Sequence, residues 1–493
     1  AFSAVTETVA DLVNESLEAS AWMPPPHPLE PKLAYTDVYV DDFCKAVQGW
    51  LNAIRVRRTT YHAIDSVFRP NDDLNIGRKQ PISVKKLCKG DDAWATQKVI
   101  LGWLIDTIAM TISLPEHRRE RLLEILTSII NRKRALVQEW HRLLGELRSM
   151  SIAIPGSQGC FSFLQEALKP GAKRIKISSQ VRHQLQDFLW LAKDVCDRPT
   201  HIAEVVPTPP TYYGAMDAAK AGMGGVWFPP GPPEPLALQP PRSSRLPAPT
   251  LWRQRFSRNI QDLVVSSDNP SGTITNSDLE LAGTIAHDDV LANAVPVTHL
   301  TTCGLCDNTP AVSWRTKGSR TTTGPAAYLL QVSSLHCRHY RYKPEFHHIP
   351  GTANAMADDC SRLWNLNDAD LLSYFNLNYP QKQSWRMHHL RPAMNSALTS
   401  SLLRQRSEPA SYLPEMPKPA KHGSSGRRFA PTSMQTPTSR RWPTLSLSSK
   451  PLACGGGMGA LHPAATQTEL ARWRTPFGLS ARRFPHWGPM TPA

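Results

Sequence analysis

The chain has 493 residues and a formal net charge of +15, with 41% hydrophobic and 20% charged residues. This length allows two or three domains, each with its own core. Nine cysteines, odd in number and unevenly spaced, do not form the pattern of a secreted disulfide framework. The longest apolar run, residues 99–114, is interrupted by Asp106 and is too short to span a bilayer. We therefore expect an intracellular protein that does not bind a membrane.

Most of the net positive charge of the chain lies at its C-terminal end. Residues 381–493 contain 16 Lys and Arg against 3 Asp and Glu, a net charge of +13, together with 14 prolines. The composition predicts a largely disordered basic tail over residues 366–493. Such a tail can attract phosphate backbones by counterion release, or it can lack any selected role. At the other end, the chain begins Ala-Phe-Ser without Met or an apolar leader, which indicates a fragment or a processed product.

In chain order, apolar residues at helical spacing predict a helix within residues 1–20. Residues 34–43, Ala-Tyr-Thr-Asp-Val-Tyr-Val-Asp-Asp-Phe, are β-branched and aromatic and predict a strand. This run ends in Asp41 and Asp42, and a tight hairpin with both acids at its tip would hold them near one metal ion. A bare Asp-Asp pair is more often an acidic surface turn, but the apolar flanks make this run more specific.

The next elements alternate between helices and strands. A second helix is expected over residues 43–55, and residues 98–104 and 107–114 predict a pair of strands. Pro115 opens a helix with one apolar face, and another helix follows over residues 134–147. These two helices predict a helical hairpin.

A new pattern follows a proline-rich stretch, residues 199–211, which is expected to be a linker. Residues 212–219 predict a strand that carries Asp217, followed by a Gly-rich turn and a returning strand that ends at Phe228. Residues 229–250 contain many prolines and predict a loop inserted into this sheet.

Three further acids follow on predicted elements. Glu280 lies on a helix capped by Asn276 or Ser277. Asp307 ends a strand over residues 298–306, and Asp358 begins a helix. A helix over residues 326–334 and a strand over residues 340–348 separate the last two acids. Each acid alone is more often a surface residue or a helix cap, but four carboxylates together can hold two Mg²⁺ ions.

A second candidate metal site involves sulfur. Cys303 and Cys306, with Cys337 and His339 further on, have a spacing that could bind zinc. Cys306 directly precedes Asp307 on a strand predicted to be buried, so we favour buried thiols.

Residues 212–365 resemble the ribonuclease H domain of a retrotransposon polyprotein. The matching motifs are Met-Asp-Ala-Ala at Asp217, Asp-Leu-Glu at Glu280, Cys-Asp-Asn-Thr-Pro-Ala-Val at Asp307, and His-Ile-Pro-Gly-Thr-Ala-Asn-Ala-Met-Ala-Asp-Asp-Cys-Ser-Arg at Asp358. The resemblance implies a mixed five-stranded sheet flanked by helices that binds Mg²⁺ or Mn²⁺ and cuts the RNA strand of RNA/DNA hybrids. Asp358 takes the last metal-binding position, and its neighbour Asp359 is given less weight.

Ribonucleases H often place a flexible histidine near the metal site. His348 is close in sequence to Asp358, and a neutral imidazole suits proton transfer or product release. A structural histidine at the junction of a strand and a turn is an equal alternative.

The stretch Tyr39-Val-Asp-Asp resembles the active-site hairpin of reverse transcriptases. The resemblance implies that Asp41 and Asp42 bind metal ions, that Tyr39 lies beside the primer end, and that an RNA template and a DNA primer are partners. It also implies a third carboxylate on an earlier strand. Asp11 precedes the hairpin by only about 30 residues, lies in a helical pattern and cannot take that position. Polymerase activity from this chain alone is therefore not expected.

Together these features predict an α+β and α/β multidomain fragment of a retroelement polyprotein. Its parts are a partial palm (1–114), a helical thumb or connection (115–198), the linker, the ribonuclease H domain (212–365) and the tail. On periodicity alone the helical hairpin is equally a plain packing unit. The expected function is metal-dependent hydrolysis of RNA in hybrids, in a cytoplasmic particle or the nucleus, with RNA-directed DNA synthesis by the intact polyprotein. The alternative is a non-catalytic remnant that only binds nucleic acid.

Overall fold

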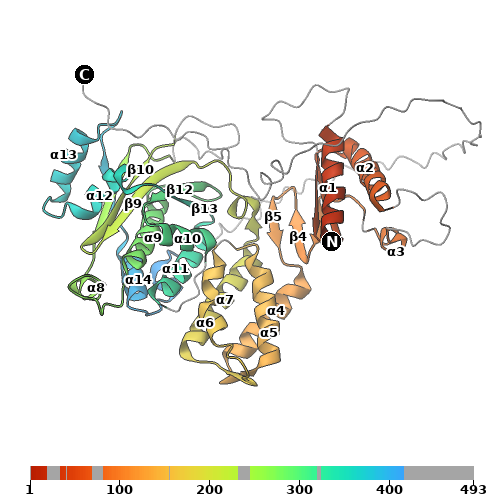
Figure 1. The fold of residues 1–493 in the computed structure, drawn as a ribbon, viewed down its shortest axis with the longest axis horizontal. Helices are drawn as coiled ribbons and strands as arrows, with labels where there is room; N and C mark the ends of the chain where they lie inside the picture. Colours follow the sequence, from red (N-terminus) through yellow and green to blue (C-terminus); the bar gives the residue numbers. More distant parts are fainter. Residues whose placement is uncertain are drawn as a thin grey trace, which may run out of the picture. The chain divides into compact units, whose positions relative to one another are not determined.

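The structure is a computed structural model with mixed helices and sheets (Figure 1). It describes residues 2–18, 34–39, 42–68, 82–90, 92–154, 156–230, 245–318 and 324–415. Residues 1–414 form one compact unit, and residues 415–493 form a second that lies almost wholly outside the described ranges. The predictions for most of the inserted loop at 229–250 and for the tail beyond residue 415 therefore also fall outside them. Within the described ranges, no helix is long and apolar enough to cross a membrane.

The N-terminal part is built from helices and a two-stranded hairpin. Its elements are α1 (Phe2–Glu18), β1 (Ala34–Tyr39), β2 (Asp42–Val47), α2 (Trp50–Phe68) and α3 (Val84–Cys88). Val9 and Val13 of α1 are buried with residues of α2. The Asn14 side chain joins α1 to β1, because it donates a hydrogen bond to the Thr36 carbonyl and accepts one from the Thr36 amide, both at 2.8 Å. The helix predicted over 1–20 is confirmed. The helix predicted over 43–55 is wrong in its first half, because these residues pair with β1.

A small antiparallel sheet follows. Its strands are β3 (Gln97–Ile100), β4 (Trp103–Asp106), β5 (Thr111–Ser113) and β8 (Thr200–His201), in that order. Leu101 and Gly102 form the turn between β3 and β4, with left-handed φ angles of 50° and 81°. Two such residues are typical of a tight hairpin turn. The single strand predicted over 98–104 is therefore wrong, because this turn divides it into two.

The helical part packs around a buried apolar stripe. Its elements are α4 (Glu116–Ile130), β6 (Arg134–Leu136), α5 (Val137–Ser151), α6 (Ser162–Glu166), β7 (Arg174–Lys176) and α7 (Ser179–Asp197). Leu122 and Leu126 of α4 and Trp140 of α5 are buried in the common core. The predicted pair of helices is confirmed. The second helix, α5, begins three residues later than predicted, because residues 134–136 pair with β7 as a strand.

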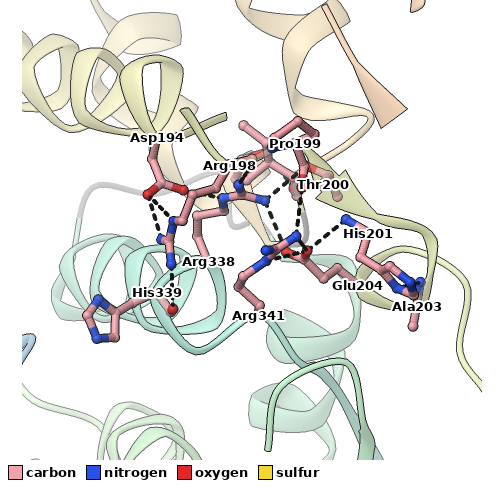
Figure 2. A network of polar contacts seen from close by, with 12 residues as sticks. Asp194, Arg198, Pro199, Thr200, His201, Ala203, Glu204, Arg338, His339 and Arg341 are labelled. Carbon is pink, nitrogen blue, oxygen red and sulfur yellow. Dashed lines mark hydrogen bonds and ion pairs between the residues drawn. The ribbon is translucent and has the colours of Figure 1, made fainter. Parts of the chain in front are cut away.

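The expected linker at 199–211 is an ordered junction. β8 pairs with β5, and Glu204 in the following 3₁₀ turn (Ile202–Glu204) is fully buried. Arg338, also fully buried, donates hydrogen bonds to Glu204 Oε2 at 3.0 Å and to Thr200 Oγ1 at 2.9 Å, and it bonds Asp194 at the end of α7 (Figure 2). The linker prediction is therefore wrong for this stretch, because charged partners distant in sequence hold it in place.

The C-terminal part contains a six-stranded mixed sheet in the order β13-β12-β9-β10-β11-β14. The strands are β9 (Tyr212–Ala219), β10 (Gly222–Phe228), β11 (Thr250–Arg255), β12 (Thr301–Cys306), β13 (Lys343–His348) and β14 (Arg386–Met387). β9, β10 and β11 are antiparallel, whereas β12, β13 and β14 each run parallel to a neighbour. The prediction of five strands omits β14, which lies in the segment assigned to the tail.

Helices cover both faces of this sheet. α9 (Asn276–Ala294), α10 (Thr309–Lys317) and α12 (Ala355–Arg362) contact its strands, while α11 (Pro325–Tyr340) packs on α9 and α8 (Arg258–Gln261) follows β11. Trp227 of β10 faces α9 and donates a hydrogen bond from Nε1 to the His287 carbonyl at 2.9 Å. Its neighbour Val226 faces the other way and is buried with Cys360 of α12. Because successive side chains of a strand point to opposite faces, α9 and α12 lie on opposite sides of the sheet.

The first fifty residues of the expected tail belong to the fold. They form α13 (Asp368–Asn378), β14, α14 (Pro392–Leu402) and α15 (Pro409–Tyr412). Leu371, Phe375 and Trp385 are buried with Val226 against α12. The boundary predicted at residue 365 is therefore too early, because these apolar side chains complete the core beneath the sheet. These elements were not predicted because the segment has few apolar residues at regular spacing.

Candidate metal centre

Four carboxylates meet at one edge of the sheet. Asp217 lies on β9, Glu280 in the second turn of α9, Asp307 directly after β12, and Asp358 on the first turn of α12. Ligand atoms of Asp217, Asp307 and Asp358 lie within 4.8 Å of one another, as do those of Glu280, Cys306 and Asp307. Asp307 belongs to both groups. The structure thus brings together the four acids that the sequence placed on separate elements.

Strand pairing explains how Asp217 and Asp307 meet. β9 and β12 are parallel, with Leu305 opposite Ala215. Asp307 therefore follows β12 two residues later, level with Asp217. Glu280 is positioned by the start of α9, where Thr275 rather than the predicted Asn276 or Ser277 is the N-cap. Its side chain and that of Asp278 form a capping box.

A glycine lets α12 bring Asp358 close to Asp217. Gly224 of β10 lies opposite Asp217, and a Cβ there would stand 2.6 Å from Cys360 Cβ and 2.8 Å from its carbonyl carbon. A side chain at this position would push α12 away from the sheet. The close approach at Gly224 is therefore a condition for assembling the four acids.

We predict that Gly224→Ala lowers the free energy of unfolding by about 1–3 kcal/mol, as overpacking in a core usually does. It should also weaken divalent-cation binding, because it displaces Asp358. Thermal unfolding and calorimetric titration with Mg²⁺ measure the two effects. Gly145→Ala is the matched control, since a Cβ at Gly145 meets nothing within 4 Å. Equal behaviour of the two variants would contradict the prediction.

Crowding of negative charge changes how these acids bind protons. Burial, then the charges of Asp217 and Asp307, raise the pKa of Glu280 well above its usual value. Burial and Asp217 likewise raise the pKa of Asp307, and they raise that of Asp358 to about 6 even though the nearby Arg362 lowers it. A cluster of acids that resists losing its protons is favourable for a cation, which relieves the same repulsion. Protons therefore compete with a cation for Asp358 up to about pH 6.

The donor atoms fit a hard divalent cation. Cys306 Sγ lies 3.8 Å from Glu280 Oε2, and burial raises the pKa of this thiol far above its usual value. Cys306 therefore stays a neutral thiol that donates to Glu280. The remaining donors are carboxylate oxygens, which suit Mg²⁺ or Mn²⁺ rather than zinc.

Two polar residues on α12 support the cluster. Ser361 Oγ donates a hydrogen bond to Asp217 Oδ2 and also lies 3.0 Å from the Asp358 carbonyl oxygen. Arg362 Nη2 lies 3.0 Å from Asp358 Oδ1, and its Nε lies 3.8 Å from Asp217 Oδ2. Neither residue was expected from the sequence to have a role. Their spacing, three and four positions after Asp358, is the signal that places them on the same helix face.

His348 and Asp359 are placed differently around the cluster. His348 is exposed at the end of β13, opposite Cys306, and its proximity offsets a small part of the rise in the pKa of Asp307. Asp359 bonds away from the site, because the hydroxyls of Tyr374 and Tyr379 donate to its Oδ2 at 3.0 and 2.7 Å. The lower weight given to Asp359 agrees with this position.

The hairpin predicted as a polymerase site is partly described. β1 and β2 pair so that Tyr39 stands opposite Asp42, and both side chains are exposed. Lys86 Nζ lies 3.9 Å from Asp42 Oδ1. Asp41 and Val40 lie outside the described residues. Asp11 is on α1, as expected. The metal-binding roles of Asp41 and Asp42 stay predictions.

The three cysteines and the histidine considered as zinc ligands do not form one site. Cys303, Cys306 and Cys337 are buried free thiols. Cys337 Sγ instead lies 3.7 Å from the Tyr342 hydroxyl. Among the residues that the structure describes, these cysteines and His339 do not appear together in any group able to hold a metal.

Comparisons with known proteins are sparse. No family model matches the chain, and no curated protein matches its sequence. Structures of a foamy viral protease-reverse transcriptase, each 11% identical, resemble it coarsely. The complex with an RNA/DNA hybrid has a TM-score of 0.30 and covers 70% of this chain and 37% of that chain. The complex with dsDNA has a TM-score of 0.29 and covers 69% of this chain and 58% of that chain. A form termed dRH, in complex with ds DNA, has a TM-score of 0.27 and covers 64% of this chain and 46% of that chain. The chain thus spans less than two thirds of these proteins.

Proposed function

We propose that the C-terminal part of this chain is a metal-dependent nuclease that hydrolyses the RNA strand of RNA/DNA hybrids. The observation that supports the proposal best is that Asp217, Glu280, Asp307 and Asp358, from four different parts of the fold, lie in two ligand groups that share Asp307. The motifs around these acids resemble ribonuclease H, and the mixed sheet agrees with that resemblance. Residues 212–415 would then form the catalytic domain, longer than the sequence alone indicated.

The residues of the chain would have distinct roles. The four acids would hold two Mg²⁺ or Mn²⁺ ions, which when bound supply an activated water and stabilise the leaving oxygen. Ser361 would keep the Asp217 carboxylate oriented through its hydrogen bond. His348 is exposed beside Asp307 and would accept or release a proton as the cut strand leaves.

The test is cleavage of a labelled RNA/DNA hybrid by the full-length chain with Mg²⁺. Asp307 belongs to both ligand groups, so we predict that Asp307→Asn reduces the rate by about 100-fold or more, as the loss of several kcal/mol of transition-state stabilisation requires. Asp268→Asn, a loss of the same charge at an exposed position, is the control and should cleave normally. If the folded wild-type chain does not cleave, or if both variants cleave equally, the proposal is wrong.

The rival is a remnant that binds nucleic acid without cutting it. In that case hybrid binding would be unaffected by Mg²⁺, and the Asp307→Asn variant would bind as the wild type does. We further propose that residues 1–114 and 115–198 are palm and thumb parts of a longer reverse transcriptase, with Tyr39, Asp41 and Asp42 at its polymerase site. In an intact retroelement polyprotein this site would use an RNA template and a DNA primer.

A further inference from the structure

Arg362 forms ion pairs with two of the four acids of the candidate metal centre, Asp217 and Asp358. Its guanidinium is 3.0 Å from Asp358 Oδ1 and 3.8 Å from Asp217 Oδ2, while more than half of its side chain, 59%, is exposed. Asp217 is only 2% exposed. One end of this long side chain thus reaches a buried carboxylate from a solvent-exposed position.

A cation bound at the cluster competes with Arg362. Asp217 and Asp358 would both be ligands, and a dication close to a guanidinium adds like-charge repulsion. Arg362 is itself mostly exposed and stands 3.8 Å from Asp217, so water can solvate its guanidinium when a cation takes over the two carboxylates. Its long, flexible side chain then presents a free guanidinium to solvent beside the acids.

The surface around Arg362 suits a phosphate backbone. Two residues further on, the Trp364 ring centroid lies 5.2 Å from the guanidinium carbon of Arg255 and 5.1 Å from that of Arg253, which is itself bonded to Asp368 and to two backbone carbonyls. Arg255 is exposed, and so is Lys220 in the turn between β9 and β10. A guanidinium matches the oxygens of a phosphate in a planar, two-point fashion.

We propose that Arg362 exchanges one anionic partner for another during substrate binding. Without metal it pairs with Asp358 and Asp217, and with metal bound it contacts a backbone phosphate of the nucleic acid next to the acid cluster. This inference rests on the proposed function and adds a phosphate-binding residue to it. Arg362 therefore weakens metal binding in the free protein and strengthens substrate binding in the metal-loaded protein.

The test measures both effects with the full-length chain. Arg362→Gln removes the competitor, so Mg²⁺ alone should bind about three- to tenfold more tightly by calorimetry. For cleavage of an RNA/DNA hybrid, KM should rise about three- to tenfold while kcat changes less than about twofold. The slope of log KM against log salt concentration should decrease by about 1, as expected when one phosphate contact is lost. Arg362→Lys keeps the positive charge, so its KM should lie between those of the wild type and Arg362→Gln.

A matched control separates a local effect from a change of net charge. Arg258→Gln removes the same charge from exposed α8 and should leave Mg²⁺ affinity and KM unchanged. Equal shifts in both variants, or no shift in Mg²⁺ affinity and KM for Arg362→Gln, would overturn the partner exchange while wild-type cleavage still supported the nuclease. A wild-type chain that neither binds Mg²⁺ nor cleaves would overturn the nuclease itself and this inference with it.

Discussion

A chain that ends at residue 365 is expected to lose its fold, although every acid of the metal centre is still present. The shortened chain lacks buried apolar side chains that lie on α13, β14, α14 and the segments beside them. These include Leu371, Phe375, Trp385, Leu390, Met394, Leu398 and Leu402. Each contributes about 1.5–3 kcal/mol when fully buried. The sum is on the order of 10 kcal/mol, which equals the entire stability of an ordinary domain.

The same truncation exposes a buried charge. Arg391 bonds Asp289, which is fully buried on α9, and donates from Nη1 to the Tyr412 carbonyl at 2.9 Å. Among the described residues, His336, 3.2 Å away, is then the side chain that still bonds Asp289. The measurement compares chains 1–365 and 1–415 by circular dichroism and thermal unfolding. The longer chain should unfold cooperatively and the shorter one should not. A cooperative transition of chain 1–365 would contradict the expectation.

The second large effect concerns Arg338 at the junction between α7 and α11. Its guanidinium is fully buried and bonds Asp194, Glu204, Thr200 and the Arg198 carbonyl (Figure 2). Arg338→Met fills much of the same space but leaves the buried Glu204 carboxylate with fewer partners. Removing one member of a buried ion pair costs about 3–5 kcal/mol. We therefore expect the midpoint of thermal unfolding to fall by about 10 °C, at about 2–4 °C per kcal/mol.

A double variant tests the cause of this loss. Glu204→Leu in the Arg338→Met background removes the stranded charge, and a buried ion pair replaced by apolar residues is often nearly neutral. The double variant should therefore recover part of the lost stability. Arg341, which also bonds Glu204 but is 20% exposed, can turn its charge towards solvent. If the two single losses simply add, Arg338 and Glu204 are not coupled and the explanation is wrong.

The local sequence determined the elements that carry the acids. β9 and β10 were predictable because aromatic and small apolar residues lie on both sides of a short break, and Asp307 ends a short apolar strand. The glycines expected in the turn, Gly222, Gly224 and Gly225, instead lie within β10. Helical spacing was enough for α4 and α5, since each has a continuous buried stripe. These signals act over a few residues, so they need no knowledge of the rest of the chain.

Only the tertiary structure decided what those elements meet. Arg338 holds residues 199–204 from more than 130 positions away, and a proline-rich composition carries no trace of that partner. Likewise, α13 and β14 are ordered because they cover Val226 and Cys360, although their own composition resembles a tail. Arg362 reaches Asp217 only because Gly224 lets α12 approach the sheet. Burial and ion pairing between distant segments depend on packing in three dimensions, which local spacing does not encode.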